Sequence, residues 1–502
     1  MSRATSLFRT KSIDELISAS EAPHGRLRKS LGLWSLVALG IGSVIGSGIF
    51  TYTGTAAAGT TIRVPSVLKA PIIDMILHGG LVATAGRPGA GPAISLSFVL
   101  VAIACGFAAL CYAELASMIP VAGSAYTYAH ATLGEIVAWI IGWDLILEYA
   151  VANMSVAVGF AAYMNDLLDN VFHFHLPEVL SNPVFANGER TGAWFNLPAF
   201  LLLMLLSWIL VRGARESAGA NNVMVAIKMI AILVFVFGAA SAIKTSNWHP
   251  FMPNGFTGVL TGGAIVFFTY IGFDSVSTAA EECDNPQRDM PRGILITLGA
   301  CALLYASVAL VLTGIVHWTT LANDAPVANA LKGLGYNRLR LVVTMGALLG
   351  MVSSLLVGQY GQARIWFAMS RDRLLPRIFS RLNRQSDVPH YSTWIAGFVV
   401  GIGAGLFDIG TLGDLTNIGT LFAFVIVSVA VIVLRRVQPD RPRSFRVPWS
   451  PVLPILSIIC CLVLMLSLPL ETWIRFVVWL LIGLAIYFFY GRRRTLATDE
   501  HG

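Results

Sequence analysis

Four ionisable side chains lie inside long apolar stretches of the sequence, where a charge is costly unless it has a partner or a function. They are Asp144, Glu148, Lys228 and Asp274. Asp144 and Glu148 are four residues apart, so one face of a helix carries both. A buried carboxylate requires a cation, and Lys228 is the only lysine within an apolar stretch. We therefore predict an ion pair between Glu148 and Lys228, with the ammonium or guanidinium group of a ligand as the alternative partner.

Lys228 has the residue type and the depth for proton exchange. It lies about ten residues into the apolar run 219–243, which is about 14 Å along a helix that rises 1.5 Å per residue. Burial favours the neutral form of an amine, so a lysine at this depth can take up and release a proton near neutral pH. The alternative is a static lysine whose ammonium group reaches the membrane surface.

The stretch GIGSVIGSGIF, from Gly40 to Phe50, contains four glycines and two serines in the middle of a long apolar run. Each glycine inside a helix costs about 1 kcal/mol relative to alanine. Their accumulation predicts a helix break with free backbone amides around Gly46, Ser47 and Gly48. The half-helix that follows directs the positive end of its dipole at the break, which suits a carboxylate. The alternative is close packing of two helices through the GxxxG pattern of this stretch.

A second interruption is predicted in VFFTYIGFDSV, residues 266–276, where Gly272 follows aromatic residues and precedes Asp274. Asp274 is expected either to cap the following half-helix or to link the break to its neighbours during gating. Interrupted helices at matching positions of two halves of a chain indicate inverted repeats with a binding site between them. We therefore expect the first ten spans to form two repeats of five helices.

The composition indicates a protein that crosses a membrane many times. Of its 502 residues, 56% are hydrophobic and 12% are charged, and the mean hydropathy is +0.72. Soluble domains carry about 25% charged residues, and a spanning helix needs about 20 mainly apolar residues. The sequence predicts an all-α membrane protein with twelve spans, at 33–58, 92–118, 127–165, 195–211, 219–243, 258–280, 291–316, 338–369, 391–407, 411–434, 449–468 and 472–490.

Basic residues are distributed unevenly between the loops of this arrangement. If both termini are cytoplasmic, 23 of the 34 Lys and Arg residues lie on the cytoplasmic side, 9 lie outside and 2 lie within helices. The positive-inside rule therefore places both termini in the cytoplasm of a multi-pass protein of the cell (plasma) inner membrane. The net charge of +7 then reflects orientation and contact with membrane lipids, and we expect no nucleic acid partner.

The predicted organisation has four parts. Residues 1–30 form a cytoplasmic tail, 31–436 the core of ten helices, 437–491 two further helices and 492–502 a second cytoplasmic tail. Within the core, 59–91 form an extended extracellular loop. Its apolar segment IIDMILHGGLVA is too short to span and is expected to be an external or interfacial helix.

The sequence lacks the common motifs of catalysis and metal binding. HExxH, Walker and GxSxG patterns are absent, as is the Cys and His spacing of metal sites. The six cysteines lie in or beside apolar runs, which is typical of buried thiols. We therefore expect no enzyme activity, no metal and no cofactor.

Several of these segments resemble the amino acid–polyamine–organocation (APC) transporters. GIGSVIGSGIF resembles their first helix, and residues 111–135 resemble their helix 2–3 loop. Residues 267–294, FFTYIGFDSVSTAAEECDNPQRDMPRGI, closely resemble the helix 6–7 region of the bacterial cationic amino acid transporter (CAT) branch, as do GWDLILEYAV and NNVMVAIK. The resemblance extends from about residue 30 to residue 490. It implies a LeuT-type fold of 5+5 inverted repeats with broken helices 1 and 6, and proton-linked or exchange transport of L-amino acids.

The resemblance implies that the break in helix 1 binds the carboxylate of the substrate. In that family, backbone amides and hydroxyl groups of this break are the ligands. The matching positions here are Ser43, Val44, Gly46, Ser47 and Gly48.

The resemblance also implies roles in helices 5 and 6. Backbone carbonyls of the helix 6 break would bind the amino group, at the positions of Phe267, Phe268 and Ile271. Phe268 would cover the substrate as a gate, in addition to the gating role predicted above for Asp274. The ammonium of Lys228 would occupy the place of the sodium ion of sodium-coupled relatives, so that protonation replaces sodium binding.

These observations predict a secondary active transporter of L-amino acids, cationic and/or small neutral, that works by alternating access and is coupled to protons through Lys228 and Glu148. The alternatives are a proton-independent exchanger, in which Lys228 is a fixed cation, and an amino acid sensor with little transport. If Glu148 pairs with Lys228, no acidic residue remains for a cationic side chain, and neutral amino acids fit equally well. The expected partners are the amino acid, the proton and lipids, with a small accessory membrane subunit as an option.

Overall fold

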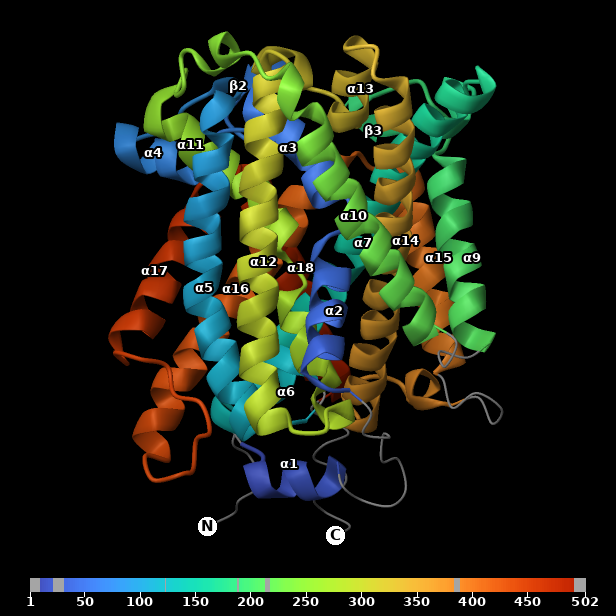
Figure 1. Ribbon diagram of the computed structural model, residues 1–502. Coiled ribbons are helices and arrows are strands. Elements are labelled where there is room, and N and C mark those ends of the chain that lie inside the picture. The colour runs from blue at the N-terminus through green and yellow to red at the C-terminus, as the bar shows by residue number, and fades with distance from the viewer. Residues whose placement is uncertain are drawn as a thin grey trace.

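The computed structural model describes residues 10–20, 31–121, 123–186, 189–212, 217–382 and 389–491. The predicted tails lie largely outside these residues. The described residues are 76% helical, and the long helices run side by side in one bundle (Figure 1). The short helix α1 (Ile13–Ser20) lies at one end of the bundle, and the strand β2 (Thr84–Pro88) lies at the other. We call these the α1 end and the hairpin end.

Nine described segments are long and apolar enough to cross a membrane, counting the bent pair α2 (Leu33–Val44) and α3 (Gly48–Ala58) as one. The others are α5 (Ile94–Met118), α7 (Glu135–Phe172), α10 (Ser217–Ala239), the segment that begins with α11 (Gly255–Val266), α12 (Pro286–Ile315), α14 (Asn337–Arg371), α16 (Ile409–Val437) and α18 (Leu470–Ile486). Shorter helices occupy the three remaining predicted spans: α9 (Leu197–Arg212), α15 (His390–Leu406) and α17 (Val452–Leu466).

The third predicted span, 127–165, has the wrong boundaries. The structure divides this region into α6 (Ser124–Thr132) and α7, which begins at Glu135 and continues to Phe172. Gly134 lies between them with φ of +95°, a conformation that glycine adopts without strain and that no helix continues through. The sequence analysis missed this turn because it lies in a mainly apolar stretch.

The loop 59–91 contains a β-hairpin, so the all-helical prediction is incomplete. β1 (Gly59–Ser66) pairs antiparallel with β2, and the short helix α4 (Ile72–His78) lies between them, as the apolar segment of this loop led us to expect. A second small hairpin joins β3 (Phe185–Ala186) and β4 (Glu189–Arg190). The remaining short elements are α8 (Glu178–Ser181), η1 (Gly91–Ala93), η3 (Ala240–Ala242), η4 (Thr245–Trp248), η7 (Trp318–Leu321), α13 (Pro326–Gly333), η8 (Arg377–Ser380) and η9 (Tyr487–Gly491).

Both predicted helix interruptions are present. The axis bends by 45° between α2 and α3, across residues 45–47. The second occurs after α11, where the 3₁₀ turn η5 (Phe267–Tyr270) ends, Ile271 is extended and a second 3₁₀ segment, η6 (Phe273–Glu282), begins. Gly272 between them has φ of +114°, which strongly favours glycine. The two breaks face each other, because a Cβ atom on Gly272 would lie 2.7 Å from Ser43 Oγ.

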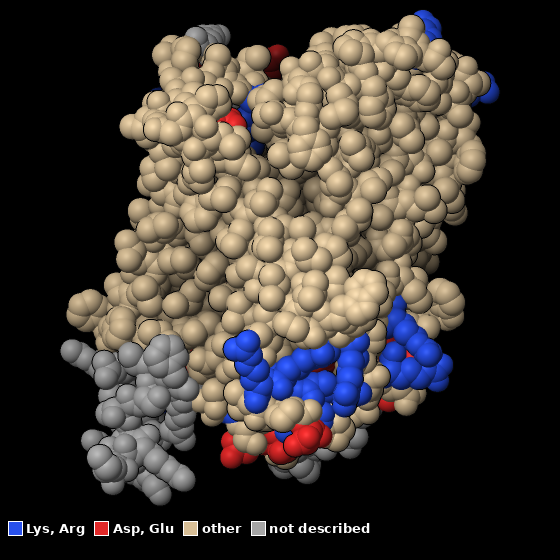
Figure 2. All heavy atoms as spheres, turned by 90° about the vertical axis from the view of Figure 1, so that its left-hand side faces the viewer, with Lys and Arg blue, Asp and Glu red and all other residues tan. Residues whose placement is uncertain are grey.

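Charged contacts tie the helices together at the α1 end. Glu114 of α5 is buried and accepts hydrogen bonds from Arg435 Nε at 2.9 Å and from Arg443 Nε at 3.2 Å. Figure 2 shows Lys and Arg gathered toward this end of the molecule, below a broad belt of uncharged side chains. This distribution is that of a protein whose middle is in contact with lipid.

Candidate functional site

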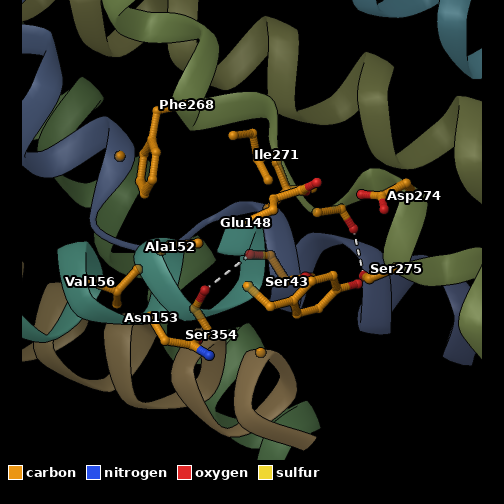
Figure 3. Close-up of a pocket in the computed structure, with 16 residues that line it drawn as sticks. Ser43, Glu148, Ala152, Asn153, Val156, Phe268, Ile271, Asp274, Ser275 and Ser354 are labelled. Carbon is orange, nitrogen blue, oxygen red and sulfur yellow. Dashed lines mark hydrogen bonds between the residues drawn. The ribbon is translucent and has the colours of Figure 1, made fainter. Parts of the chain in front are cut away.

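A cavity lies where the two broken helices meet α7 and α14 (Figure 3). Its wall contains most of the residues predicted to bind substrate. Ser43, Val44, Gly46, Gly48, Phe268 and Ile271 line this central cavity, as do Glu148 and Asp274. Ser47, Phe267 and Lys228 are outside its lining.

The first break presents polar groups of the type that bind a carboxylate. α3 begins at Gly48, and the first amides of a helix have no partner within it. The adjacent Ser47 is fully buried, and its hydroxyl group has no hydrogen-bond partner among the described residues. In contrast, the amide of Gly46 donates to the carbonyl of Val44 at 3.0 Å, so this group is already used. The amides of Phe50 and Thr51 both donate to the carbonyl of Ser47, so the amides available to a ligand are those of Ser47, Gly48 and Ile49.

The second break contributes two of its three predicted residues to the wall. Phe268 and Ile271 line the cavity together with Gly272. Phe267 points elsewhere, because its ring packs edge-to-face against Phe424 of α16, with centroids 5.9 Å apart. Asp274 lines the cavity, and the N-cap position of η6 is occupied by Gly272. Both roles predicted for Asp274, the cap and the gate, therefore stay predictions.

Lys228 contacts the first break and not Glu148. Its Nζ atom donates hydrogen bonds to the carbonyl oxygens of Gly42 at 2.7 Å and Ile45 at 2.8 Å, and the side chain is fully buried. These carbonyls lie at the end of α2, where the helix no longer supplies amide partners. Within the described part of the chain no carboxylate forms an ion pair with Lys228, so the predicted pair is not formed.

Glu148 and Asp144 of α7 therefore have surroundings that differ from the predicted ion pair. Glu148 is 2% exposed and faces the cavity, and its Oε2 atom has no hydrogen-bond partner among the described residues. Asp144 is fully buried outside the cavity lining, and neither of its carboxylate oxygens has a described hydrogen-bond partner. Burying carboxylates without hydrogen-bond partners costs folding free energy. The acidic side of the cavity is therefore not explained by a contribution to stability.

The cavity has an apolar side that the sequence analysis missed. In Figure 3, Phe268, Ala152 and Val156 lie on one side, and Glu148, Asp274 and Ser275 lie on the other. Glu148, Ala152 and Val156 follow one another at intervals of four along α7, which places them on one helix face. The sequence analysis could have predicted these lining residues from their spacing. Asn153, Tyr149 and Gly358 also line the cavity and had no such signal.

Ser353 and Ser354 are adjacent in α14. Ser354 donates from its hydroxyl group to the carbonyl of Ser43 at 3.1 Å, which links α14 to the first break. Ser353 is fully buried. Arg364, further along α14, stacks over the ring of Tyr360, with 4.0 Å from its guanidinium carbon to the ring centroid.

The sequence matches a family model described as amino acid permease over residues 31–489. The chain belongs to this family, within the APC superfamily. It is 44% identical to the branched-chain amino acid permease BcaP of Bacillus subtilis over 98% of both chains. It is 43% identical to the methylthioribose transporter of the same organism, over 98% of this chain and 99% of the relative.

More distant relatives include a plant protein of the branch that the motifs resemble. Cationic amino acid transporter 9 of Arabidopsis thaliana is 36% identical over 87% of this chain and 72% of the relative. The permease is therefore a multi-pass membrane transporter of the amino acid class and not an enzyme. The names of its relatives cover branched-chain and cationic substrates as well as a sulfur-containing sugar.

Proposed function

We propose that this permease is a secondary active transporter that binds L-amino acids in the central cavity and moves them by alternating access. The observation that carries the proposal is the meeting of two broken helices at one cavity. Backbone that departs from a helix at membrane depth is stable where it lines a cavity or is buried in protein. Such breaks expose amides and carbonyls, the groups that recognise the ends of an amino acid.

The carboxylate of the substrate binds at the start of α3. The first amides of this helix, from Gly48 on, are directed at the break and carry the positive end of the helix dipole. The buried hydroxyl group of Ser47, which lacks a described partner, is a further donor beside them. The amino group binds to carbonyls of the second break, near Phe268 and Ile271, with Phe268 as the gate.

The side chain of the substrate is aliphatic in this proposal. The cavity has an apolar side, which suits an aliphatic chain and is formed by Val44, Ala152, Val156, Phe268 and Ile271. The BcaP relatives from Bacillus subtilis and Lactococcus lactis, 44% and 35% identical, bear the name of branched-chain permeases. Both arguments favour leucine, isoleucine and valine.

Cationic amino acids are the second candidate. The observation that favours them is the cavity-facing Glu148, whose carboxylate is not paired with Lys228. Together with Asp274 it offers negative charge to a side-chain ammonium or guanidinium group. The original objection to cationic substrates, that the acidic residue is already neutralised, therefore no longer applies.

Proton coupling is proposed to act through Lys228. A protonated Lys228 joins the carbonyls of Gly42 and Ile45 and holds the end of α2 in its broken form. Loss of the proton removes charge-assisted hydrogen bonds and loosens the break, which links protonation to movement of helix 1. The rival is a proton-independent exchanger in which Lys228 is permanently charged. Glu148 faces the central cavity and does not pair with the coupling lysine.

The proposed membrane topology has twelve spans, with α2 to α16 as two inverted repeats of the LeuT type and α17 and α18 outside them. The divisions at residues 31, 437 and 492 follow from this topology. Both termini are cytoplasmic, which places the α1 end inside the cell and the hairpin end outside. The proposed partners are membrane lipids, protons and an accessory membrane subunit.

Uptake by proteoliposomes tests the proposal. Labelled leucine and arginine are offered at symmetrical pH and with an inward proton gradient, to wild type, to Lys228→Met and to the exposed-lysine control Lys244→Met. We expect leucine to be preferred and its uptake to respond to the gradient in all but Lys228→Met. Uptake that ignores the gradient in wild type supports the exchanger, preference for arginine supports the second candidate, and binding without uptake refutes transport.

A further inference from the structure

A second, larger cavity lies at the hairpin end and is separated from the central cavity by two aromatic rings. This vestibule is lined by the hairpin, α3 and the first turns of α16. Tyr52 of α3 lines the vestibule, and Phe268 lines the central cavity. The centroids of the two rings are 4.5 Å apart, with an angle of 31° between the planes. The rings are therefore in direct contact where the two cavities approach each other.

The hydroxyl group of Tyr52 is held by two other helices. It donates to the carbonyl oxygen of Ile409, at the start of α16, with an O···O distance of 2.6 Å. It also lies 2.5 Å from the hydroxyl group of Ser155 on α7. Because a carbonyl can only accept, the Tyr52 proton goes to Ile409, and Ser155 is the donor of the other bond. Tyr52 is only 3% exposed, so both bonds are shielded from water.

The packing leaves the ring of Tyr52 little freedom. Gly413, one turn along α16 from Ile409, faces the ring, and a Cβ atom there would lie 2.4 Å from the Tyr52 hydroxyl oxygen. The ring thus lies in a slot bounded by Phe268, α7 and α16. Its neighbours belong to the second broken helix and to both proposed repeats.

We propose that Tyr52 is a positioning residue for the gate: its ring holds Phe268 over the central cavity, and its hydroxyl group fastens α3 to α7 and α16, closing the cavity toward the vestibule. This inference rests on the proposed function, in which the cavity opens alternately to the two sides. Opening toward the vestibule requires the Tyr52 bonds to break, because α3 cannot separate from α16 while they persist.

Cysteine accessibility measures this closure directly. Ala152→Cys places a thiol in the central cavity, and a membrane-impermeant thiol reagent is applied to each side of oriented vesicles. A separate Thr61→Cys variant, at an exposed vestibule position, identifies which side the vestibule faces. The reaction of the six native cysteines is subtracted. We then compare Ala152→Cys alone with the same variant carrying Tyr52→Phe or Ser155→Ala.

A matched control is available in Tyr163. Its hydroxyl group donates to the carbonyl of Phe50 on α3 at 2.7 Å, and it is fully buried, but it lines neither cavity. Tyr163→Phe therefore removes a similar bond to the same helix without affecting the contact with Phe268. It distinguishes loss of closure from general loosening of α3.

We expect Tyr52→Phe to raise the labelling rate from the vestibule side roughly fivefold, the factor that corresponds to one net hydrogen bond. Ser155→Ala should act in the same direction, and labelling from the other side and in Tyr163→Phe should stay unchanged. Equal effects of Tyr52→Phe and Tyr163→Phe, equal effects on both sides, or no effect would each overturn the inference. Protection of Ala152→Cys by leucine tests the proposed function separately, because it does not depend on Tyr52.

Discussion

Arg87 of β2 donates two parallel hydrogen bonds to Asp414 of α16, from Nη1 to Oδ1 at 3.0 Å and from Nη2 to Oδ2 at 2.7 Å. Each side chain is only 10% exposed. A second ion pair, between Lys69 and Glu471 at 2.6 Å, connects the same loop to the start of α18. The loop 59–91 is thus fastened to two helices on either side of the vestibule, by pairs that sequence spacing could not indicate.

Removing Arg87 should destabilise the protein. Arg87→Ala leaves the Asp414 carboxylate buried without its partner, and we expect the free energy of unfolding to fall by about 3 kcal/mol. Arg87→Lys should recover part of the loss, since an ammonium group cannot form the bidentate contact. Thermal unfolding in detergent gives the ranking, with Arg190→Ala of the exposed hairpin β3–β4 as the control. Equal midpoints for Arg87→Ala and Arg190→Ala would contradict the prediction.

Gly48 should tolerate no side chain. A Cβ atom there would lie 2.8 Å from the backbone Cα of Thr269, so the two helix breaks would have to separate. A Cβ atom on Gly46 meets Ser354 Oγ at 2.8 Å, which is the end of a side chain and can be removed. We expect Gly48→Ala to abolish leucine uptake and Gly46→Ala to reduce it.

A second substitution, at Ser354, distinguishes the effect of Gly46→Ala from that of Gly48→Ala. Ser354→Gly should restore uptake to Gly46→Ala but not to Gly48→Ala, because Ser354 is the obstacle at Gly46, whereas Thr269, with its backbone, is the obstacle at Gly48. Gly106→Ala is the control, since nothing lies within 4 Å of the added methyl group. A Gly48→Ala variant with normal uptake would show that the breaks do not need this close approach.

The sequence was sufficient to locate the two breaks because glycine acts locally. A run of glycines in an apolar helix is unfavourable wherever the helix packs, and the bend at residues 45–47 and the positive φ of Gly272 occur where predicted. The turn at Gly134 was missed, since a single glycine in an apolar stretch is also compatible with an unbroken helix.

The partner of Lys228 could not be predicted in the same way. The sequence indicates the depth of a side chain in a helix but not its rotation, and it favoured the acidic residue Glu148 over backbone atoms. The carbonyls of Gly42 and Ile45 become acceptors only once the helix is broken, so the contact depends on the tertiary structure. The hairpin was missed for a related reason, because its pairing joins Gly59 to Pro88 across an intervening helix.

The apolar side of the central cavity should set the size of the substrate. Ala152→Leu adds three carbons to this side, between Phe268 and Val156, where the proposed aliphatic side chain lies. We expect the KM for leucine to rise at least about tenfold, the effect of about 1.4 kcal/mol, and the KM for alanine to change little. Competition uptake in proteoliposomes measures both. A parallel change for the two substrates would place the side chain elsewhere, and Glu148→Gln then tests the acidic side with arginine.

The α1 helix should detach from the bundle in acid, because Asp372 holds it. Lys11 Nζ lies 2.9 Å from Asp372 Oδ1, and the Tyr126 hydroxyl group donates to Oδ2 at 2.6 Å. Burial by itself raises the pKa of Asp372, but the Lys11 ammonium and the Tyr126 hydroxyl outweigh it, and the pKa lies below its usual value of 3.8. A lowered pKa means that docking is stabilised above about pH 4 and that this contribution is lost as the pH falls through the lowered value.

A spin label at the exposed Ser18 reports this detachment as increased mobility. We expect wild type to stay docked from pH 8 to about pH 4 and to loosen below it. Asp372→Asn should be loosened at neutral pH and should lose most of the change in the acid range, since the remaining ion pair of α1, between Asp14 and Arg441 at 2.7 Å, is exposed on the Asp14 side. Glu15→Gln, which removes an exposed carboxylate from α1 itself, should behave as wild type. If Asp372→Asn keeps α1 as immobile as wild type at pH 7, other contacts, those of Ile13 with the core and of Asp14 with Arg441, hold the helix in place.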